Sequence, residues 1–306
     1  MVAVVFPGQG SQKPGMGRDL FESHEAARNV FSQIAESTGV DVQNLCFEAD
    51  EETLRQTQNA QLALYTCGLA AYACLDLVPD AFAGHSIGEY AAVVSAGVLS
   101  IGDGAKLVLR RGELMASAGQ ARPGTMAAIL GLEREALQAV CESVTSGVCV
   151  IANDNCPGQL VISGDVAGVQ EACAAAMEAG AKRALPLNVS GAFHSPLMED
   201  SAREMGLALR AAPFGDVAQQ IDVYANVTAS KIQHASEWPD LLEKQLMSPV
   251  RWTESVQSMI TDGIDSFVEC GSGEVLCGLI KRINRDVATS SVFDNATLDK
   301  FRGVTA

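Results

Sequence analysis

The sequence has little positive charge for its length. It contains 21 Lys and Arg residues against 37 Asp and Glu residues, which gives a net charge of −16. Nucleic acids and anionic membranes bind basic surfaces, so this balance argues against either as the main partner. We therefore expect no nucleic-acid partner and no membrane partner, although a single local basic patch is compatible with this charge.

Long apolar runs and paired cysteines are also missing. Val2–Phe6 is too short for the apolar region of a signal peptide, and no basic residues precede it. The longest apolar-rich stretch, residues 62–75, falls short of a membrane span. The nine cysteines are scattered and form no Cys-x-x-Cys pair. We therefore expect no disulfide framework, no metal site and a reducing, cytoplasmic location.

The rest of the composition is that of a globular protein with a core, at 48% hydrophobic and 19% charged residues. A chain of 306 residues predicts about two domains, or one domain with a sizeable insertion. Both ends of the chain predict alternating strands (2–6, 80–83, 221–225, 266–269) and helices (23–37, 58–77, 89–96, 103–118, 274–284), with a further helix after His194. The final dozen residues are predicted to be a plain tail.

The middle of the chain has a different pattern. It predicts strands at 125–130, 148–153, 159–163 and 182–188 and helices at 133–144 and 166–179. The resulting order βαββαβ is that of a ferredoxin-like unit. We predict an α/β fold in which residues 123–189 form an inserted ferredoxin-like subdomain, and residues 1–122 and 190–306 form the larger catalytic subdomain.

The pattern Gly84-x-Ser86-x-Gly88 has the form of a nucleophile elbow between a predicted strand and a predicted helix. Such a turn exposes the serine hydroxyl, and the next backbone N–H, that of Ile87, points toward a developing oxyanion. A glycine-rich structural turn is the alternative interpretation. The strand and helix on either side favour the elbow.

A serine nucleophile needs a base, and the chain has four histidines. His85 lies within the elbow, where the turn aims it away from the neighbouring hydroxyl, and His24 and His234 lie in polar contexts that indicate solvated side chains. His194 lies in a loop of small residues before a helix, a common place for catalytic groups. The residues alone leave a structural role for His194 open.

Two further segments carry potential chemistry. The loop of residues 7–12 is rich in glycine but lacks the ending of a phosphate-binding P-loop, so it is either a turn without chemistry or a backbone donor for an oxyanion. Arg110 and Arg111 interrupt an apolar helix. At least one of them should lie on the surface, whereas the other could point inward, where a guanidinium needs a carboxylate opposite it.

Five motifs in order resemble one known family: Phe6-Pro7-Gly8-Gln9-Gly10-Ser11-Gln12, Gly84-His85-Ser86-Ile87-Gly88-Glu89-Tyr90, Arg111-Gly112, Gly191-Ala192-Phe193-His194-Ser195-Pro196-Leu197-Met198 and Gln245-Leu246-x-x-Pro249-Val250-x-Trp252. Together they resemble malonyl-CoA:acyl carrier protein transacylases, a family that includes the acyltransferase domains of polyketide synthases. The resemblance covers nearly the whole chain, and it implies that the larger subdomain has an α/β-hydrolase-like core with a parallel sheet.

The resemblance also implies catalytic roles. Ser86 corresponds to the nucleophile and His194 to its base, and the backbone carbonyl of Gln245 orients the histidine in place of an acid. The backbone N–H groups of Gln9 and Ile87 correspond to the oxyanion hole. The implied reaction is ping-pong: malonyl passes from coenzyme A to Ser86 and then to the pantetheine thiol of acyl carrier protein, with no cofactor and no metal. We expect the enzyme to act as a monomer.

Substrate and partner contacts follow from the same resemblance. Arg111 corresponds to the ligand of the malonyl carboxylate, and Phe193 should crowd an α-methyl branch. Acyl carrier proteins are typically acidic, so we expect a basic docking patch, first at Lys281, Arg282 and Arg285 and more weakly at Lys182 and Arg183.

Two other functions stay open, and the residues argue against a third. A free-standing acyltransferase of a polyketide synthase would carry similar motifs. A serine ester or thioester hydrolase would need a carboxylate between the nucleophile and the histidine in the chain. A non-catalytic binding protein would lack Ser86 or His194, and both are present. Small departures from the family pattern, which concern only details of the pocket, occur at Asp154, Cys156, Met247 and Ser248.

Overall fold

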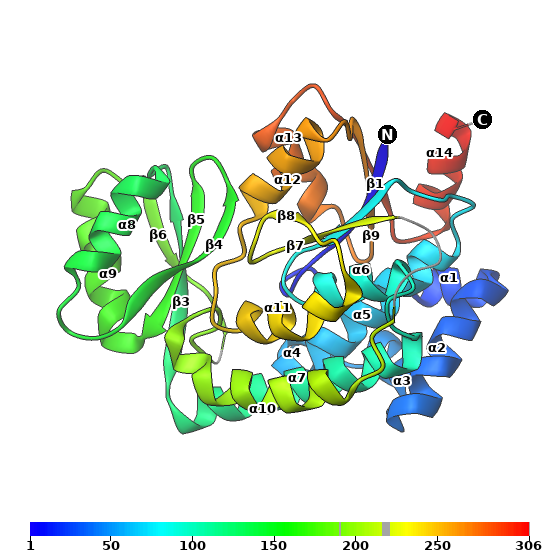
Figure 1. The fold of residues 1–306 in the computed structure, drawn as a ribbon, viewed down its shortest axis with the longest axis horizontal. Helices are drawn as coiled ribbons and strands as arrows, with labels where there is room; N and C mark the ends of the chain where they lie inside the picture. Colours follow the sequence, from blue (N-terminus) through cyan, green and yellow to red (C-terminus); the bar gives the residue numbers. More distant parts are fainter. Residues whose placement is uncertain (190, 216–220, 306) are drawn as a thin grey trace.

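The computed structural model describes residues 1–189, 191–215 and 221–305. Ser190, the first residue of the predicted histidine loop and of the second catalytic segment, lies outside this part, as does Ala306. The chain forms a larger, mainly parallel sheet covered by helices and a smaller antiparallel sheet to one side (Figure 1). The protein is therefore a mixed α/β structure with two sheets.

The larger sheet has the strand order β10-β9-β1-β2-β7-β8, in which β7 and β8 pair antiparallel and the other neighbours are parallel. The strands are β1 (Val2–Phe6), β2 (Ala81–Gly84), β7 (Asp222–Ala225), β8 (Ser230–Lys231), β9 (Ser266–Cys270) and β10 (Ala288–Val292). Phe6 pairs with Gly84, so β1 and β2 end level with one another. The loops that follow them therefore lie side by side.

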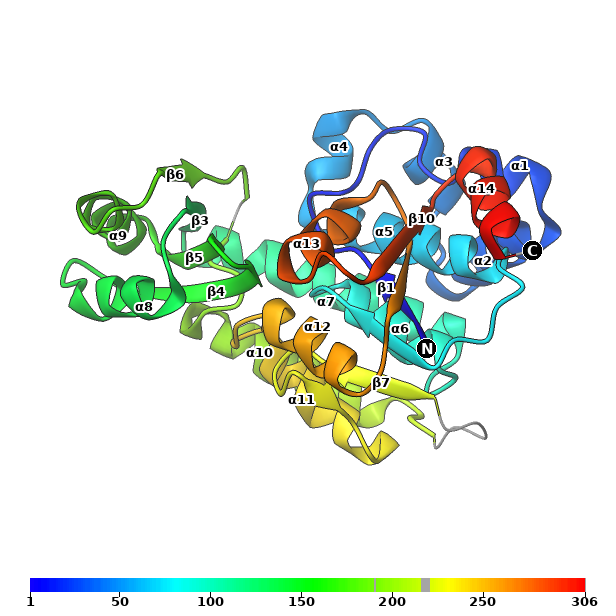
Figure 2. The ribbon, with the colours of Figure 1, turned by 90° about the horizontal axis from the view of Figure 1, so that it is seen from above.

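Helices cover both faces of this sheet (Figure 2). They are α1 (Arg18–Ser23), α2 (Glu25–Thr38), α3 (Val42–Phe47), α4 (Glu51–Arg55), α5 (Thr57–Ala73), α6 (Gly88–Ser95), α7 (Ile101–Ala121), α10 (Glu199–Ala211), α11 (Trp238–Gln245), α12 (Trp252–Thr261), α13 (Val275–Ile283) and α14 (Asn295–Thr305), with short 3-10 turns at Pro196–Met198 and Ala235–Glu237.

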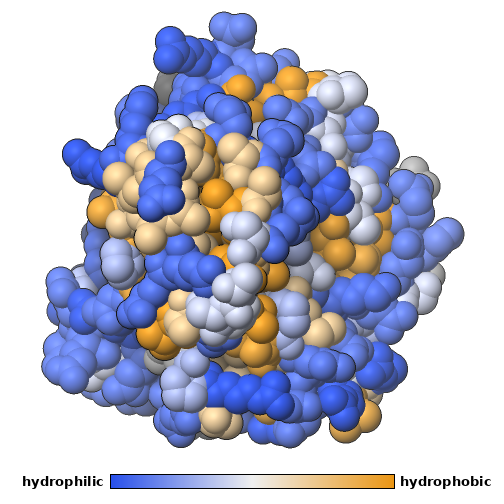
Figure 3. Space-filling model, turned by 90° about the vertical axis from the view of Figure 1, so that its left-hand side faces the viewer, coloured by the Kyte–Doolittle hydropathy of each residue, from blue (hydrophilic) through white to orange (hydrophobic). Residues whose placement is uncertain are grey.

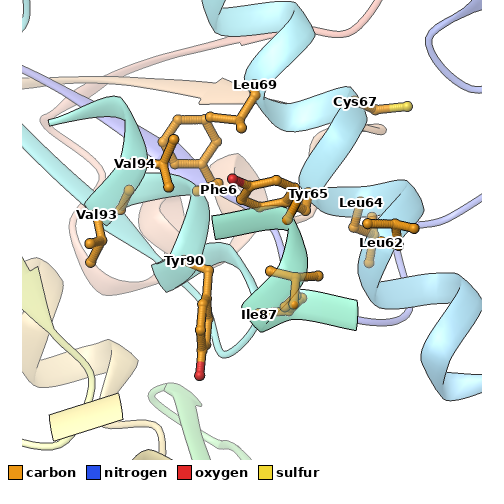
Figure 4. Packing of buried hydrophobic residues seen from close by; sticks show 14 of the residues in the cluster. Phe6, Leu62, Leu64, Tyr65, Cys67, Leu69, Ile87, Tyr90, Val93 and Val94 are labelled. Atoms are coloured by element: carbon orange, nitrogen blue, oxygen red, sulfur yellow. The ribbon is translucent and has the colours of Figure 1, made fainter. Parts of the chain in front are cut away.

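Alternation along β1 explains the two covered faces, because successive side chains of a strand point to opposite sides. Val4 and Phe6 pack with α2, α5, α6 and α7, whereas Ala3 and Val5 pack with α12 and α13. Figure 4 shows Phe6 among side chains of α5 and α6 in the first of these cores. The apolar run that is too short for a signal peptide is thus a strand buried on both faces.

The smaller sheet has the order β4-β5-β3-β6, and all of its pairs are antiparallel. Its elements along the chain are β3 (Gly124–Leu130), α8 (Arg134–Ser143), β4 (Cys149–Cys156), β5 (Gln159–Asp165), α9 (Val166–Glu178) and β6 (Arg183–Pro186). They enclose a core of their own. The outer side of this unit is largely hydrophilic with scattered apolar patches (Figure 3); its exposed apolar residues include Met177 and Leu185.

Strand β4 of the smaller sheet contacts the segment of the larger unit that precedes α12. Asn153 bridges to Val250, whose N–H donates to the Ala152 carbonyl at 2.9 Å. Asp154 forms an ion pair with Arg134 at 2.9 Å. It also accepts a hydrogen bond from Thr253 Oγ1 at 2.6 Å. The residue that departs from the family pattern at 154 thus takes part in the contact between the two units.

The prediction of a plain tail is wrong, because α14 occupies this segment. Leu298 is fully buried and Phe301 nearly so, and both pack in the core that contains Phe6. Their spacing of three places both on one helix face. The patterns also missed α1, α3, α4, α11, α12, β8 and β10. None of the helices in residues 1–189, 191–215 and 221–305 combines the length and the apolar character that a membrane span requires.

Candidate active site

Ser86 lies on the tight turn between β2 and α6, as predicted. Its φ of +52° is left-handed, a conformation that non-glycine residues seldom adopt and that marks functional sites. The flanking glycines allow the close packing of this turn. A methyl group on Gly84 would lie 1.9 Å from the Gly88 carbonyl carbon, and one on Gly88 would lie 2.1 Å from the Phe6 carbonyl oxygen.

The structure brings His194 to Ser86 although 108 positions separate them, with 2.8 Å between Nε2 and Oγ. His194 Nδ1 lies 2.8 Å from the Gln245 carbonyl and 3.1 Å from the Ser248 carbonyl. Carbonyl oxygens only accept, so Nδ1 carries the proton and Nε2 accepts from the serine hydroxyl. This tautomer leaves Nε2 available to take the serine proton.

The environment of His194 keeps its ring neutral. Burial is the main cause and the nearby Arg111 charge the second, and together they lower the pKa of His194 to about 3. The hydrogen bonds to the two carbonyls act in the opposite direction. An imidazole with this pKa is uncharged at neutral pH, which is the state that a general base requires.

A cavity of about 420 Å³ opens above Ser86 and His194. It lies between the two units: Gln9 lines it from the loop after β1, and Met126 lines it from β3. Ile87 immediately precedes α6, so its N–H is among the amides at a helix start that find no partner within the helix. The two predicted oxyanion donors, the backbone N–H groups of Gln9 and Ile87, thus belong to segments that border Ser86.

Arg111 is buried beneath the serine, at 1% exposure. It donates to Gln61 Oε1 at 2.7 Å, to Gln245 Oε1 at 2.8 Å and to Ser86 Oγ at 3.1 Å. No ion pair of Arg111 occurs among the residues that the structure describes. The predicted carboxylate opposite the inward arginine is therefore not supplied directly by the protein. Arg110 is exposed and pairs with Glu204 at 2.8 Å.

The other histidines have structural contacts. His85 Nε2 lies 2.8 Å from Asn155 Oδ1, so it faces the smaller sheet and not the serine hydroxyl. His24 Nε2 lies 2.8 Å from Asn295 Oδ1. His24 is therefore only partly solvated, because α14 covers it. His234 is exposed, as predicted.

Asn226 was not predicted from the sequence; it accepts a hydrogen bond from the Ser86 N–H at 2.8 Å and donates to the Gly84 carbonyl at 2.6 Å. Its position directly after β7 could have identified it, because polar residues at the carboxyl ends of parallel strands commonly build sites. Gln61, in the middle of the buried helix α5, gave no comparable signal.

The predicted specificity and docking residues lie in different surroundings. Phe193 is buried and lines the cavity. Lys281 donates to the Val287 carbonyl at 2.6 Å, and Arg282 donates to the Gln159 side chain, so both make contacts within the protein while staying exposed. Arg285 is exposed, as are the weaker candidates Lys182 and Arg183 near β6.

Comparison with known proteins gives one consistent family. The acyl transferase domain matches residues 3–293. "Malonyl CoA-acyl carrier protein transacylase" of Bacillus subtilis is 44% identical over 303 residues, which cover 97% of this chain and 95% of the relative. The Staphylococcus aureus (strain MW2) protein of the same name is 40% identical and covers 98% of this chain and 97% of the relative.

Solved structures agree with this result. An acyl carrier protein S-malonyltransferase from Vibrio cholerae superimposes with a TM-score of 0.94 at 40% identity, covering 98% of this chain and 99% of that one. A malonyl-transacylase in complex with a type II PKS acyl-carrier protein superimposes with a TM-score of 0.93 at 37% identity, with 98% of each chain covered. Since both the family match and the relatives span almost the whole chain, this protein is an acyltransferase that belongs to the same family as the malonyl CoA-acyl carrier protein transacylases.

Proposed function

We propose that the protein transfers malonyl from malonyl-CoA to the phosphopantetheine thiol of acyl carrier protein through a malonyl-serine intermediate, and so supplies fatty acid chain elongation. The names of the curated relatives support the reaction. The observation that carries the choice of malonyl is the buried Arg111 guanidinium, which lies 3.1 Å from the Ser86 hydroxyl. In a malonyl ester of Ser86, one CH2 group separates the ester carbonyl from the free carboxylate, which would therefore lie beside this guanidinium.

In the first half-reaction, Ser86 Oγ attacks the thioester carbonyl while His194 Nε2 takes the hydroxyl proton. The oxyanion that forms is stabilised by the backbone N–H groups of Ile87 and Gln9. The carbon–sulfur bond then breaks, and coenzyme A leaves as the thiol with the proton from His194. The Gln245 carbonyl holds the ring in position and offers less charge to an imidazolium than a carboxylate would.

In the second half-reaction, His194 Nε2 takes the proton of the carrier's thiol, and the thiolate attacks the malonyl ester. The ester bond breaks, Ser86 Oγ regains the proton, and a thioester forms on the carrier. All of these groups come from one chain, which supports a monomeric enzyme. The chemistry requires neither a metal nor a redox cofactor.

The contacts of His194 argue against a hydrolase with a conventional triad. Its Nδ1 donates to the carbonyls of Gln245 and Ser248, and no carboxylate of the described residues is among its hydrogen-bond partners. A hydrolase of neutral esters would also have no need for a buried guanidinium beside the nucleophile. These two features favour transfer of an acyl group that carries a free carboxylate.

The same proposal extends to architecture and location. The element and strand orders of residues 123–189 support a ferredoxin-like subdomain, and the parallel sheet with its serine turn supports an α/β-hydrolase-like subdomain made of residues 1–122 and 190–306. The cysteines of the described residues are all free thiols, which supports a reducing cytoplasm.

The direct test is mass spectrometry of the enzyme mixed with malonyl-CoA. We expect one malonyl adduct, on the peptide that contains Ser86, and its loss in Ser86→Ala together with nearly all transfer. Loss of a nucleophile in such a unit costs several orders of magnitude in kcat. A full-yield adduct in Ser86→Ala, or no adduct in the wild type, would refute the proposal.

Service to a polyketide synthase is the second candidate function. It is favoured by the structural relative solved with a type II PKS acyl-carrier protein. Single-turnover transfer from malonyl-Ser86 to a fatty acid carrier and to a polyketide carrier separates the two. If the rate constant of transfer to the fatty acid carrier is no higher than that to the polyketide carrier, polyketide synthesis replaces fatty acid synthesis as the proposed function.

A further inference from the structure

Glu89 is a buried acid that the proposed reaction does not use. It lies in α6, three residues after Ser86, and is 1% exposed. Its Oε1 accepts from the backbone N–H of Asn226 at 2.9 Å, and its Oε2 accepts from Gln245 Nε2. An isolated carboxylate is costly to bury, so contacts of this kind indicate a specific role.

The two partners of Glu89 are also the residues that hold Ser86. Asn226 Oδ1 accepts from the Ser86 N–H at 2.8 Å, and Gln245 Nε2 donates to the Ser86 carbonyl at 3.0 Å. The left-handed backbone of the serine is therefore fixed at both its N–H and its carbonyl, and both contacts lead to the Glu89 carboxylate.

Gln245 also connects Glu89 to Arg111. The side-chain oxygen of Gln245 accepts from Arg111 Nη2 at 2.8 Å, while its nitrogen donates to Glu89. The amide thus lies between a buried cation and a buried anion, which fixes its orientation. The backbone carbonyl of the same residue orients His194. One carboxylate therefore restrains the nucleophile, the base and the arginine together.

We propose that Glu89 is the positioning residue of this site: it fixes Gln245 and Asn226, and it supplies the negative charge that balances Arg111 without contacting it. This inference rests on the proposed function, because Arg111 must stay free of a direct carboxylate contact to bind the malonyl carboxylate. An aspartate or glutamate in direct contact with the guanidinium would compete with the substrate. A carboxylate that is separated from the guanidinium by the Gln245 amide does not compete with the substrate.

The role requires Glu89 to be ionised, because a protonated carboxyl would direct an O–H at one of two N–H donors. Burial raises the pKa of Glu89 to about 7, against the opposing effects of Asn226, Gln245 and Arg111. Arg111 on α7 and Tyr90 on α6 interact electrostatically with Glu89. The site is therefore in its working form above about pH 7 and loses it as the pH falls.

The other elements packed against α6 place few competing groups near Glu89. The strands β1 and β2 contain no ionisable residue. From α5, Tyr65 donates to the Ile101 carbonyl, and from β7, Tyr224 donates to Asp262. His194, with a pKa of about 3, stays neutral through the same pH range.

The test is the rate of malonyl-Ser86 formation in a single turnover between pH 5 and 8.5. We expect the wild-type rate to fall roughly tenfold per pH unit below about pH 7. In Glu89→Gln, the NH2 group of the introduced side chain must face the N–H of Asn226 or of Gln245. The variant also lacks the negative charge that balances Arg111. Its rate should therefore be pH-independent across this range and roughly 10- to 100-fold below the wild-type plateau, as expected when a positioning contact is lost.

Glu269→Gln is the matched control. Glu269 is fully buried, and burial also raises its pKa to about 7, but it lies on β9 and accepts from the Cys277 N–H. Its variant should keep the wild-type pH dependence. The proposal would be overturned if the wild-type rate did not fall below about pH 7. It would also be overturned if this fall disappeared in Glu269→Gln or persisted in Glu89→Gln.

This design separates the two hypotheses and survives a folding failure. A wild type that forms no malonyl-Ser86 refutes the proposed function, whereas a wild-type adduct with an unchanged Glu89→Gln rate refutes only the role of Glu89. If circular dichroism shows that Glu89→Gln does not fold, the pH–rate profiles of the wild type and Glu269→Gln still decide. A fall in the rate below about pH 7 in both proteins supports the proposal, and any other result overturns it.

Discussion

At the scale of single residues, Arg110 and Arg111 separate a surface charge from a buried one. Adjacent residues of a helix differ by about 100° in direction, which is enough to turn one guanidinium to solvent and the other into the site. Arg110 is 45% exposed in its side chain and pairs with Glu204, whereas Arg111 is 1% exposed. Both residues are arginines in adjacent positions of α7, so a substitution at Arg110 is a matched control for the same substitution at Arg111.

We predict that Arg111→Ala selectively impairs malonyl transfer. Leaving the buried malonyl carboxylate without its guanidinium partner costs on the order of 2–5 kcal/mol, or roughly thirtyfold to several thousandfold in kcat/KM. Acetyl-CoA has no carboxylate, so its use should fall little or rise. The measurement is kcat/KM for both thioesters, with Arg110→Ala as the control. Equal losses for both thioesters would show that Arg111 only supports the fold, and a selective loss in Arg110→Ala would exchange the two roles.

Phe193 should set the preference for malonyl over methylmalonyl. Its buried ring lines the cavity directly before His194, and we expect it to crowd an α-methyl branch of the substrate. One methyl group is worth about 1–3 kcal/mol of discrimination, so the preference should be clear but incomplete. Competition between the two CoA esters measures it, and Phe193→Ser should narrow the ratio. Equal use of both esters by the wild type would exclude this role.

At the scale of elements, the turn between β2 and α6 depends on the absence of side chains at its glycines. We predict that Gly84→Ala abolishes Ser86 malonylation and lowers the melting temperature, because its methyl group would overlap the Gly88 backbone at 1.9 Å. Gly278→Ala in α13 is the control, since no described atom beyond the adjacent backbone of its own helix lies within 4 Å of a methyl group there. It should stabilise the protein by up to about 1 kcal/mol. Full activity in Gly84→Ala would contradict the packing of this turn.

How far the sequence predicts these elements depends on where their determinants lie. The elbow and the small sheet were predicted because glycine spacing and apolar periodicity are local signals. The helix α14 was missed because Leu298 and Phe301 form too short a pattern to stand out, and they are stabilised by burial against distant residues. For the same reason Asn226 was missed: its role depends on the distant turn at Ser86 that it supports.

At the scale of the whole molecule, two acidic proteins must meet if the partner is a typical carrier protein. This chain has a net charge of −16, so docking of an acidic carrier requires a local basic patch on its surface. Lys281 and Arg282 lie in the last turn of α13, where cations also complement the helix dipole. Their internal contacts fix the two side chains in place without burying them.

We predict that reversing Lys281 and Arg282 to glutamate slows transfer from malonyl-Ser86 to the carrier, more strongly at low salt than at high salt, while malonylation by malonyl-CoA is unchanged. Lys300→Glu, on the exposed side of α14, changes the net charge by as much as Lys281→Glu or Arg282→Glu alone, so it is the control for net charge in comparison with these single variants. Quenched-flow measurements at several salt concentrations give the rate of transfer from malonyl-Ser86 to the carrier. Unchanged transfer at low salt would place the docking surface elsewhere, first at Lys182 and Arg183.

The strand order of the larger sheet has a consequence for biosynthesis. β1 leaves the ribosome long before its neighbour β9, which begins at Ser266, so β1 stays unpaired on one side until β9 has been made. The small sheet pairs entirely within residues 124–186, and such local contacts form early. A nascent chain stalled at residue 250 should therefore contain a protease-resistant small sheet beside an unfinished one, whose exposed strand is a target for chaperones.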